Sequence, residues 1–208
     1  MPIKNIIFDL GGVILNIDYQ LTEKAFVDLG CFDFNKIFSQ AKQTTLFDDF
    51  EEGKIDETAF FYKLKELSGL DVSYLDLKKA WNAMLINLPE ANYEMLKKLR
   101  KKYRLFLLSN TNETHIAAFT KLVEEVCPIS EFEGVFEKVY YSSRIGARKP
   151  HVAPFLKIIL ENNLSPDETL FIDDSIQHVE GAIKAGLKGE LLPRGKTTEE
   201  FLRELSIL

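Results

Sequence analysis

Four polar segments, each placed at or soon after the end of a short apolar run, carry the side chains best suited to chemistry. In chain order they are Asp9 after residues 6–8, Ser109 and Asn110 after 105–108, Lys149 beyond 139–141, and Asp173 and Asp174 after 170–172. Taken singly, each segment is also typical of a turn or a helix cap. Together they offer a carboxylate nucleophile, a hydroxyl, a cation and a pair of further carboxylates.

Transfer of a phosphoryl group to an aspartate needs this set of groups. A carboxylate attacks phosphorus, and Mg²⁺ held by carboxylates and by the substrate phosphate offsets the repulsion between two anions. A serine hydroxyl and helix amides can hold phosphate oxygens, and a lysine supplies a compact positive charge. We therefore interpret Asp9 as the nucleophile, Ser109 and Asn110 as substrate-binding residues, and Lys149 as both a catalytic and a substrate-binding residue.

The elements that must position these groups alternate along the chain. Between the apolar runs lie stretches with helical spacing, marked by Ile116, Phe119 and Val123, by Val152, Leu156 and Ile159, and by Ile176, Val179 and Ile183. Strands that alternate with helices predict βαβ units, because parallel strands need crossover connections. We expect an α/β fold with a Rossmann-like parallel sheet, helices on both of its faces, and the polar segments at one sheet edge.

The segment of residues 16–89 has helical periods without intervening strands. The expected helices are one around Phe60, Leu64 and Leu67 with Asp56 as its N-cap, and one from Leu77 through Trp81 and Met84 to Leu88. We predict a small α-helical cap domain, residues 16–89, inserted into a core domain of residues 1–15 and 90–208. A cap over the strand ends would exclude water and shape a pocket, and a purely stabilising bundle is the alternative.

Composition limits the classes of partner. The chain has 208 residues, a net charge of −6, two cysteines and no apolar run of membrane-spanning length. These features favour a cytoplasmic protein with one main core, and they disfavour nucleic-acid or membrane partners. The three histidines have no ligand-like spacing and are expected in surface or packing roles. Nothing in the sequence indicates the oligomeric state.

The order, spacing and local sequence of the four segments resemble the haloacid dehalogenase-like hydrolase superfamily over essentially the whole chain. Asp9 matches its nucleophile, Ser109 its second motif, Lys149 its third, and the pair Asp173 and Asp174 its acidic fourth motif. The helical segment falls where one branch of the superfamily carries its cap. Within that branch, the segments around Asp9, Ser109 and Asp173 are similar to bacterial sugar-phosphate phosphatases that act on α-D-glucose 1-phosphate.

The resemblance implies a Mg²⁺-dependent phosphomonoester hydrolase with an aspartyl-phosphate intermediate on Asp9. The implied substrate is a small phosphorylated metabolite, with a sugar phosphate as one candidate. In the family the metal is held by the nucleophile, by the backbone carbonyl two residues later and by a motif-four carboxylate. These are Asp9, Gly11 and Asp173 here, with Asp174 as a further ligand or as a supporting group.

Gly11 departs from the usual pattern, in which a second carboxylate serves as general acid. Its carbonyl can bind a metal, but glycine cannot protonate a leaving alkoxide or activate water. General acid–base catalysis contributes ~10²–10⁴-fold, so we expect slow turnover of esters with poor leaving groups. Asp18 is a candidate substitute from the cap junction, although a capping or hinge role is the favoured interpretation.

Two other functions remain open at this point. In a haloacid dehalogenase the aspartate attacks carbon, and the position of Gly11 also lacks a carboxylate. Asp173 and Asp174 disfavour this function, because two acids beside the nucleophile would repel an anionic haloacid unless Mg²⁺ neutralised them. The second alternative is a binding or regulatory protein that keeps the phosphate site and has lost turnover because Gly11 replaces the general acid.

Overall fold

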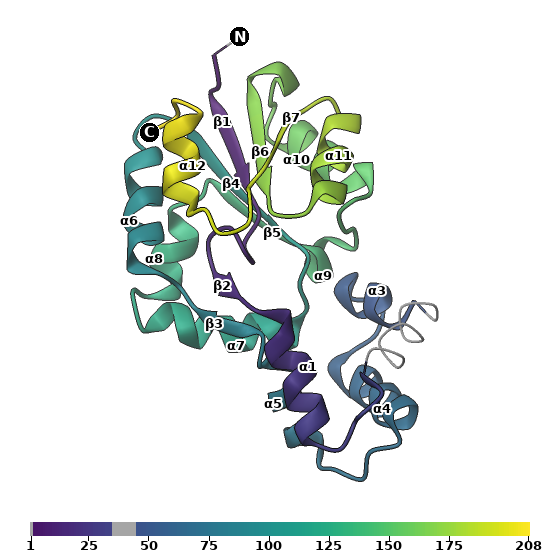
Figure 1. Cartoon of the computed structure of the whole chain (residues 1–208). Coiled ribbons are helices and arrows are strands. Elements are labelled where there is room, and N and C mark those ends of the chain that lie inside the picture. Colours follow the sequence, from purple (N-terminus) through teal and green to yellow (C-terminus); the bar gives the residue numbers. More distant parts are fainter. Residues whose placement is uncertain (1, 35–44) are drawn as a thin grey trace.

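A five-stranded parallel sheet forms the centre of the computed structural model, which describes residues 2–34 and 45–208 (Figure 1). The strands are β1 Asn5–Phe8, β4 Arg104–Ser109, β5 Lys138–Tyr141, β6 Thr169–Asp173 and β7 Lys188–Leu191, in the spatial order β5-β4-β1-β6-β7. The chain winds outward from β1 in both directions, and ligands of such sheets bind at the carboxyl ends near this switch point. The predicted Rossmann-like α/β fold is confirmed.

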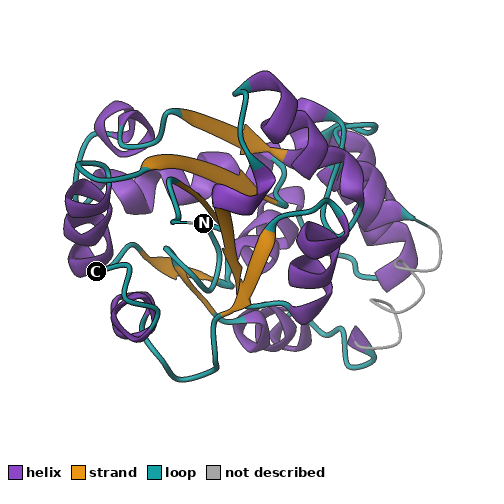
Figure 2. Ribbon diagram, turned by 90° about the horizontal axis from the view of Figure 1, so that it is seen from above, coloured by secondary structure: helices purple, strands orange, loops and turns teal. Residues whose placement is uncertain are grey.

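Helices cover both faces of the sheet because successive side chains of each strand point to opposite sides. Ile6 and Phe8 enter one buried apolar cluster, whereas Ile7 enters another. The first cluster is completed by α6 Glu90–Leu99, α7 Glu113–Glu124, α8 Ile129–Gly134 and α12 Thr198–Glu204, and the second by α10 Val152–Glu161 and α11 Ile176–Lys184. Figure 2 shows helices on both sides of the sheet. Two short turns, α9 Ser142–Ile145 and the 3₁₀ turn η1 Pro166–Glu168, complete the connections.

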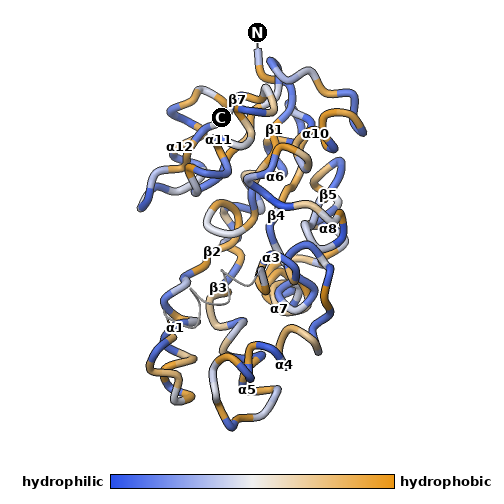
Figure 3. The backbone as a smooth tube through the Cα atoms, turned by 90° about the vertical axis from the view of Figure 1, so that its right-hand side faces the viewer, coloured by the Kyte–Doolittle hydropathy of each residue, from blue (hydrophilic) through white to orange (hydrophobic). Residues whose placement is uncertain are grey.

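Within the described residues, four further helices lie beyond the carboxyl ends of the strands (Figure 1). They are α1 Tyr19–Asp28, α3 Leu46–Glu51, α4 Glu57–Ser68 and α5 Tyr74–Asn82. Hydrophobic and hydrophilic residues alternate along them, as in helices that bury one side (Figure 3). Their buried apolar side chains belong to a cluster of residues 26–81 that is distinct from the two clusters on the sheet. Phe60 contributes ring contacts with Phe47, Phe50, Phe61 and Trp81.

A two-stranded antiparallel ribbon connects the sheet with these helices, and it corrects the prediction that residues 16–89 lack strands. Its strands are β2 Asn16–Ile17 and β3 Leu85–Asn87. Helix α5 therefore ends at Asn82 and does not reach Leu88, which packs in a core cluster of the sheet. The spacing of apolar residues cannot separate a last helical turn from a three-residue strand, and pairing with β2 decides between them.

Local sequence signals predict where a helix starts more accurately than where it ends. The side chain of Asp56 accepts a hydrogen bond from Ala59 N at 2.8 Å, as predicted for the N-cap of α4. Strand β7 was not predicted, because Leu191 is the one large apolar residue of its sequence Lys-Gly-Glu-Leu and none of the four residues is fully buried. Over the two described ranges, no helix has the length and apolar composition needed to cross a bilayer.

Replacing Phe60 by alanine tests whether the helices over the strand ends depend on their own core. Phe60 is fully buried, so Phe60→Ala should lower the free energy of unfolding by ~3–5 kcal/mol through lost burial and a residual cavity. Urea denaturation measures this change. Tyr62→Ala on the same helix is the matched control, because Tyr62 is 73% exposed and its loss should change stability by at most ~0.5 kcal/mol. Equal effects of the two variants would contradict the prediction.

Candidate active site

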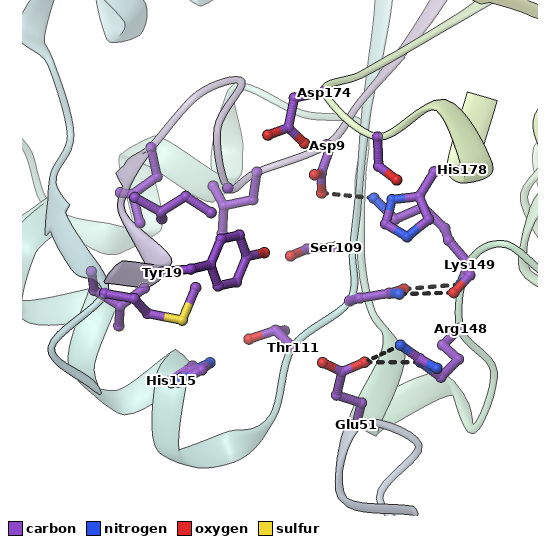
Figure 4. A pocket seen from close by; sticks show the side chains of 18 of the residues that line it. Asp9, Tyr19, Glu51, Ser109, Thr111, His115, Arg148, Lys149, Asp174 and His178 are labelled. Carbon is purple, nitrogen blue, oxygen red and sulfur yellow. Dashed lines mark hydrogen bonds and ion pairs between the residues drawn. The ribbon is translucent and has the colours of Figure 1, made fainter. Parts of the chain in front are cut away.

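A cavity of about 550 Å³ opens at the carboxyl ends of β1, β4 and β6 (Figure 4). Of the residues singled out in the sequence, the ones that line it are Asp9, Gly11, Ser109, Asn110, Lys149 and Asp174. Asp173 is fully buried directly behind them and contacts Lys149. The structure thus brings the four polar segments to one place, although they are up to 165 residues apart, from Asp9 to Asp174.

The loop after Asp9 is held tightly against the end of β6. The Asp9 amide donates to the carbonyl of Ile172 at 3.0 Å, and the Gly12 amide donates to the carbonyl of Leu15 at 2.8 Å. Gly12 has a φ of +75°, and a Cβ there would lie 2.3 Å from Oδ2 of Asp174. Glycine at position 12 is therefore required for the Asp174 carboxylate to lie beside the Asp9 loop.

Lys149 forms the electrostatic centre of the site. Its Nζ lies 2.7 Å from Oδ1 of Asp9 and 2.6 Å from Oδ2 of Asp173, and the side chain is fully buried. Burial alone would lower the pKa of Lys149, but the two carboxylates outweigh it and raise the pKa above its ordinary value. Lys149 is therefore held as an ammonium ion.

Asp9 and Asp173 share this one cation unequally. The pKa of Asp9 is raised to about 7. Burial is the main cause, the positive charge of Lys149 opposes the rise, and the negative charge of Asp173 adds to it. Burial would also raise the pKa of Asp173, but Lys149 and His178 outweigh burial there and lower it. A second cation near Asp9 would favour its ionised, nucleophilic form.

His178 belongs to the site, contrary to the expectation of a surface or packing role. It lies on α11, where its Nδ1 is 3.0 Å from both carboxylate oxygens of Asp173. The Ser175 amide donates to the same carboxylate at 2.8 Å. Asp173 thus has polar contacts on several sides and orients Lys149. His178 reaches Asp173 because α11 starts directly after β6, which the spacing of histidines in the sequence does not indicate.

The loops that carry Asn110 and Lys149 are joined through the side chain of Asn110. Its Nδ2 donates to the Lys149 carbonyl and its Oδ1 accepts from the Lys149 amide, both at 2.9 Å. The buried Ser142 hydroxyl holds the same loop by bonds to the backbone of Thr111. Asn110 therefore positions Lys149 in this structure, while Ser109 lines the cavity beside Asp9.

The far wall of the cavity comes from α1, α3 and the residues between α5 and β3. Tyr19, Glu51 and Met84 line it. Arg148, which precedes Lys149, donates from Nε to Oε2 of Glu51 at 2.8 Å (Figure 4) and also pairs with Asp48. This ion pair ties the residue before the buried lysine to helix α3.

His115 of α7 is a second tie between the sheet and the helices over it. Its ring stacks on Trp81 with centroids 5.2 Å apart, and its Nε2 lies 3.3 Å from the Trp81 carbonyl. Burial lowers the pKa of His115 to about 4. The imidazole is therefore neutral near neutral pH and serves packing, as expected from the sequence.

Asp18 has a local role at the start of α1. Its side chain accepts from the Gln20 amide at 2.9 Å, which is the hydrogen bond of an N-cap. Within the described ranges, Asp18 is not among the residues that line the cavity. The favoured interpretation of Asp18 as a capping residue is confirmed.

The donor set fits a hard divalent cation. Asp9, Asp173 and Asp174 present three carboxylates against the single ammonium of Lys149, and the Gly11 backbone lines the same cavity. Mg²⁺ binds through a few carboxylate and carbonyl oxygens with water completing its shell. In the described part of the chain, Asp9, Asp173 and His178 place potential ligand atoms within 4.8 Å of one another. Asp174 stands outside that group and is exposed to the cavity.

Comparison with known proteins agrees with this geometry. Residues 3–186 match the model of the haloacid dehalogenase-like hydrolase family. The chain therefore belongs to the haloacid dehalogenase-like hydrolases, and the family resemblance seen in its motifs is confirmed.

Two relatives matched by sequence and one solved structure illustrate the similarity. A D-ribitol-5-phosphate phosphatase of Bacteroides thetaiotaomicron is 33% identical over 85% of this chain and 85% of its own. A sesquiterpene phosphatase of Aspergillus oryzae is 27% identical over 97% and 96%. A family enzyme of Bacteroides thetaiotaomicron, solved in complex with magnesium and inorganic phosphate, has a TM-score of 0.85 at 30% identity, covering 97% of this chain and 100% of that one.

Lys149→Met should strongly destabilise the protein in the presence of EDTA. The substitution keeps much of the buried volume but leaves two buried carboxylates unpaired, and breaking such a group costs ~3–5 kcal/mol. Urea denaturation measures the loss. Lys63→Met is the matched control, since Lys63 pairs with Glu66 on the exposed surface of α4 and should matter little. A Lys149→Met protein as stable as the control would contradict the buried triad.

His115 makes stability depend on pH in a defined direction. Its pKa is about 4 when folded against an ordinary value of 6.5, so between these values the unfolded chain binds a proton that the folded chain does not. This contribution destabilises the protein as pH falls. The difference in unfolding free energy between wild type and His115→Gln should therefore shrink from about pH 7 to about pH 5. Urea denaturation at each pH tests this, with His151→Gln reporting the loss of an exposed histidine. A difference in unfolding free energy between wild type and His115→Gln that grows on acidification would contradict this prediction.

Proposed function

We propose that this protein is a Mg²⁺-dependent phosphomonoester hydrolase that uses Asp9 as its nucleophile. The observation that carries the proposal is the buried contact of Lys149 with both Asp9 and Asp173, beside an exposed Asp174. This arrangement holds one carboxylate at the cavity floor next to fixed positive charge. It suits attack on a phosphate anion, because the charges are in place before the substrate arrives.

In the proposed reaction each residue has a distinct role. A carboxylate oxygen of Asp9 attacks phosphorus, the ester bond breaks, and an aspartyl phosphate forms. Lys149 neutralises charge on the transferred group, and the Ser109 hydroxyl binds a phosphate oxygen. Water then attacks phosphorus, which releases inorganic phosphate and regenerates Asp9. Asn110 contributes by fixing the Lys149 backbone, and its predicted direct contact with substrate remains part of the proposal.

The proposed metal ligands are oxygen atoms of Asp9, Gly11, Asp173 and Asp174. Asp173 already accepts bonds from Lys149, Ser175 and His178, so Asp174 is the more available carboxylate. When bound, Mg²⁺ supplies positive charge that offsets the repulsion between the substrate and the carboxylates.

We propose a small phosphorylated metabolite as substrate, with a sugar or sugar-alcohol phosphate as the leading candidate. The name of the 33% identical relative, a D-ribitol-5-phosphate phosphatase, supports this class. The cavity of about 550 Å³ is large enough for such a molecule. The helical segment of residues 16–89 acts in this proposal as the cap that closes over the substrate and contacts its alcohol part.

The two alternative functions predict different chemistry. Displacement of halide from carbon needs no metal, and Asp173 and Asp174 would oppose an anionic haloacid beside Asp9. A protein that only binds phosphate esters would show saturable binding without turnover. The buried lysine and its two carboxylates favour turnover, because a binding site for an anion gains nothing from carboxylates next to it.

Asp9→Asn tests the nucleophile. Wild-type protein should hydrolyse para-nitrophenyl phosphate with Mg²⁺ and lose this activity in EDTA, and Asp9→Asn should lose it in Mg²⁺ because an amide is a poor nucleophile. Asp28→Asn, at the exposed end of α1, is the matched control and should keep full activity. Release of nitrophenolate is followed by absorbance. Activity that survives Asp9→Asn would reject Asp9 as nucleophile, and saturable phosphate binding without turnover would favour the binding protein.

A further inference from the structure

The space beside Gly11, where a general acid would project, is filled with hydrocarbon. A Cβ built on Gly11 would lie 3.0 Å from Cδ1 of Ile17 and 3.7 Å from its Cγ2. Ile17 belongs to β2 and lines the same cavity. The missing carboxylate is thus replaced by an aliphatic side chain, and any proton donor to the leaving oxygen must come from another part of the cavity wall.

Tyr19 lies two residues beyond Ile17, at the first turn of α1. Asp18 caps that helix and thereby fixes where Tyr19 begins it. The Tyr19 side chain lines the cavity, and its hydroxyl points toward Ser109 on the side where Asp9 lies (Figure 4). Asp9 reaches the cavity from the sheet and Tyr19 reaches it from the helices above. A phosphoryl group between them would have the nucleophile and the phenol on different sides, as in-line displacement requires.

The hydroxyl of Tyr19 is free to engage a ligand. Among the residues that the structure describes, it has no hydrogen-bond partner, whereas Tyr103, Tyr140 and Tyr141 all donate to oxygen atoms of the protein. A phenol that faces a polar cavity without a partner is a donor available to substrate.

Three other titratable groups around the cavity already have partners, whereas Asp174 and Arg194 lie on loops that follow β6 and β7, on the sheet side of the cavity. His178 contacts Asp173, and both ring nitrogens of His115 have partners in Asn112 and Trp81. Glu51 is held by Arg148. On the far wall of the cavity, the described residues therefore leave Tyr19 as the proton-bearing side chain that has no partner and can turn to a substrate.

The electrostatic surroundings keep Tyr19 protonated. Partial desolvation at the cavity wall, followed by the negative charges of Asp9, Asp174 and Glu51, raises the pKa of Tyr19 above its ordinary value, although 66% of the residue's surface is exposed. Such a phenol is a weak acid that suits a strongly basic alkoxide and has little to offer a nitrophenolate.

We propose that the Tyr19 hydroxyl donates the proton to the leaving oxygen, in place of the acid absent at Gly11. This proposal rests on the proposed function. As the bond from Asp9 to phosphorus forms and the ester bond breaks, the phenol proton moves to the ester oxygen and the alcohol leaves. Tyr19 is then a phenolate. In the second step it takes a proton from the attacking water, the phosphoryl bond to Asp9 breaks, and both residues return to their starting forms.

The test is the dependence of Tyr19→Phe on the leaving group. We compare kcat/KM for para-nitrophenyl phosphate with kcat/KM for an alkyl phosphate such as glycerol phosphate. The parameter kcat/KM is used because it reports the steps up to formation of the aspartyl phosphate. Removing the donor should lower kcat/KM for the alkyl ester ~10²-fold, within the usual range for general acid catalysis. The value for the nitrophenyl ester should stay nearly unchanged, since nitrophenolate leaves without a proton. That retained activity also shows that the variant is folded.

Tyr62→Phe is the matched control, because Tyr62 is an exposed tyrosine of α4 outside the cavity-lining set, and both substrates should keep their rates. If Tyr19→Phe lowers kcat/KM equally for both substrates, the hydroxyl binds the phosphoryl group and the proposal of proton donation is overturned. Unchanged rates for both would overturn any role in the first step. If wild type hydrolyses neither ester, the proposed function fails, and proton donation by Tyr19 fails with it.

Discussion

The contact of one buried ammonium ion, on Lys149, with the carboxylates of Asp9 and Asp173 is the interaction on which the rest of the site depends. Two carboxylates cannot remain buried side by side as anions unless a cation lies between them. Lys149 satisfies this condition for Asp173 and only partly for Asp9, whose pKa stays raised. The geometry of the nucleophile is thereby fixed, while its charge remains responsive to a further cation.

This constraint explains several features that otherwise look unrelated. Asn110 binds both backbone polar groups of Lys149, so the second segment holds the third in place. His178 and the Ser175 amide complete the hydrogen bonds of Asp173. Gly12 is small because Asp174 must lie against it. Each contact either positions the buried charges or makes room for the acids around them.

The far wall of the cavity does not depend on the buried charges, because an apolar cluster of its own supports it. The wall meets the sheet through the β2–β3 ribbon, the stack of His115 on Trp81, and the pairing of Arg148 with Glu51. The ribbon puts Ile17 beside Gly11 and Tyr19 over the cavity. The same short segment that occupies the usual place of a general acid thus brings in the phenol that we propose as its replacement.

Much of the fold could be predicted because it rests on local patterns. The apolar runs before Asp9, Ser109 and Asp173 are strands, and Asp56 caps its helix. The ends of α5 and the two short ribbon strands could not be predicted, because apolar spacing over three residues fits a helix and a strand equally well. Strand β7 has too little apolar character to signal itself and is defined by its pairing with β6.

The identity and order of the chemical groups follow from local sequence, since strand-end carboxylates, a lysine and a hydroxyl can be recognised from their neighbours. How these groups share charge, and which further side chains join them, depends on the packing of elements that are distant in the sequence. His178, Tyr19 and Arg148 carry no local signal, because their roles depend on what packs against them from elements distant in the sequence. Burial and proximity arise when the sheet and the helices above it come together, and those two quantities set the pKa of Asp9 and the freedom of the Tyr19 hydroxyl.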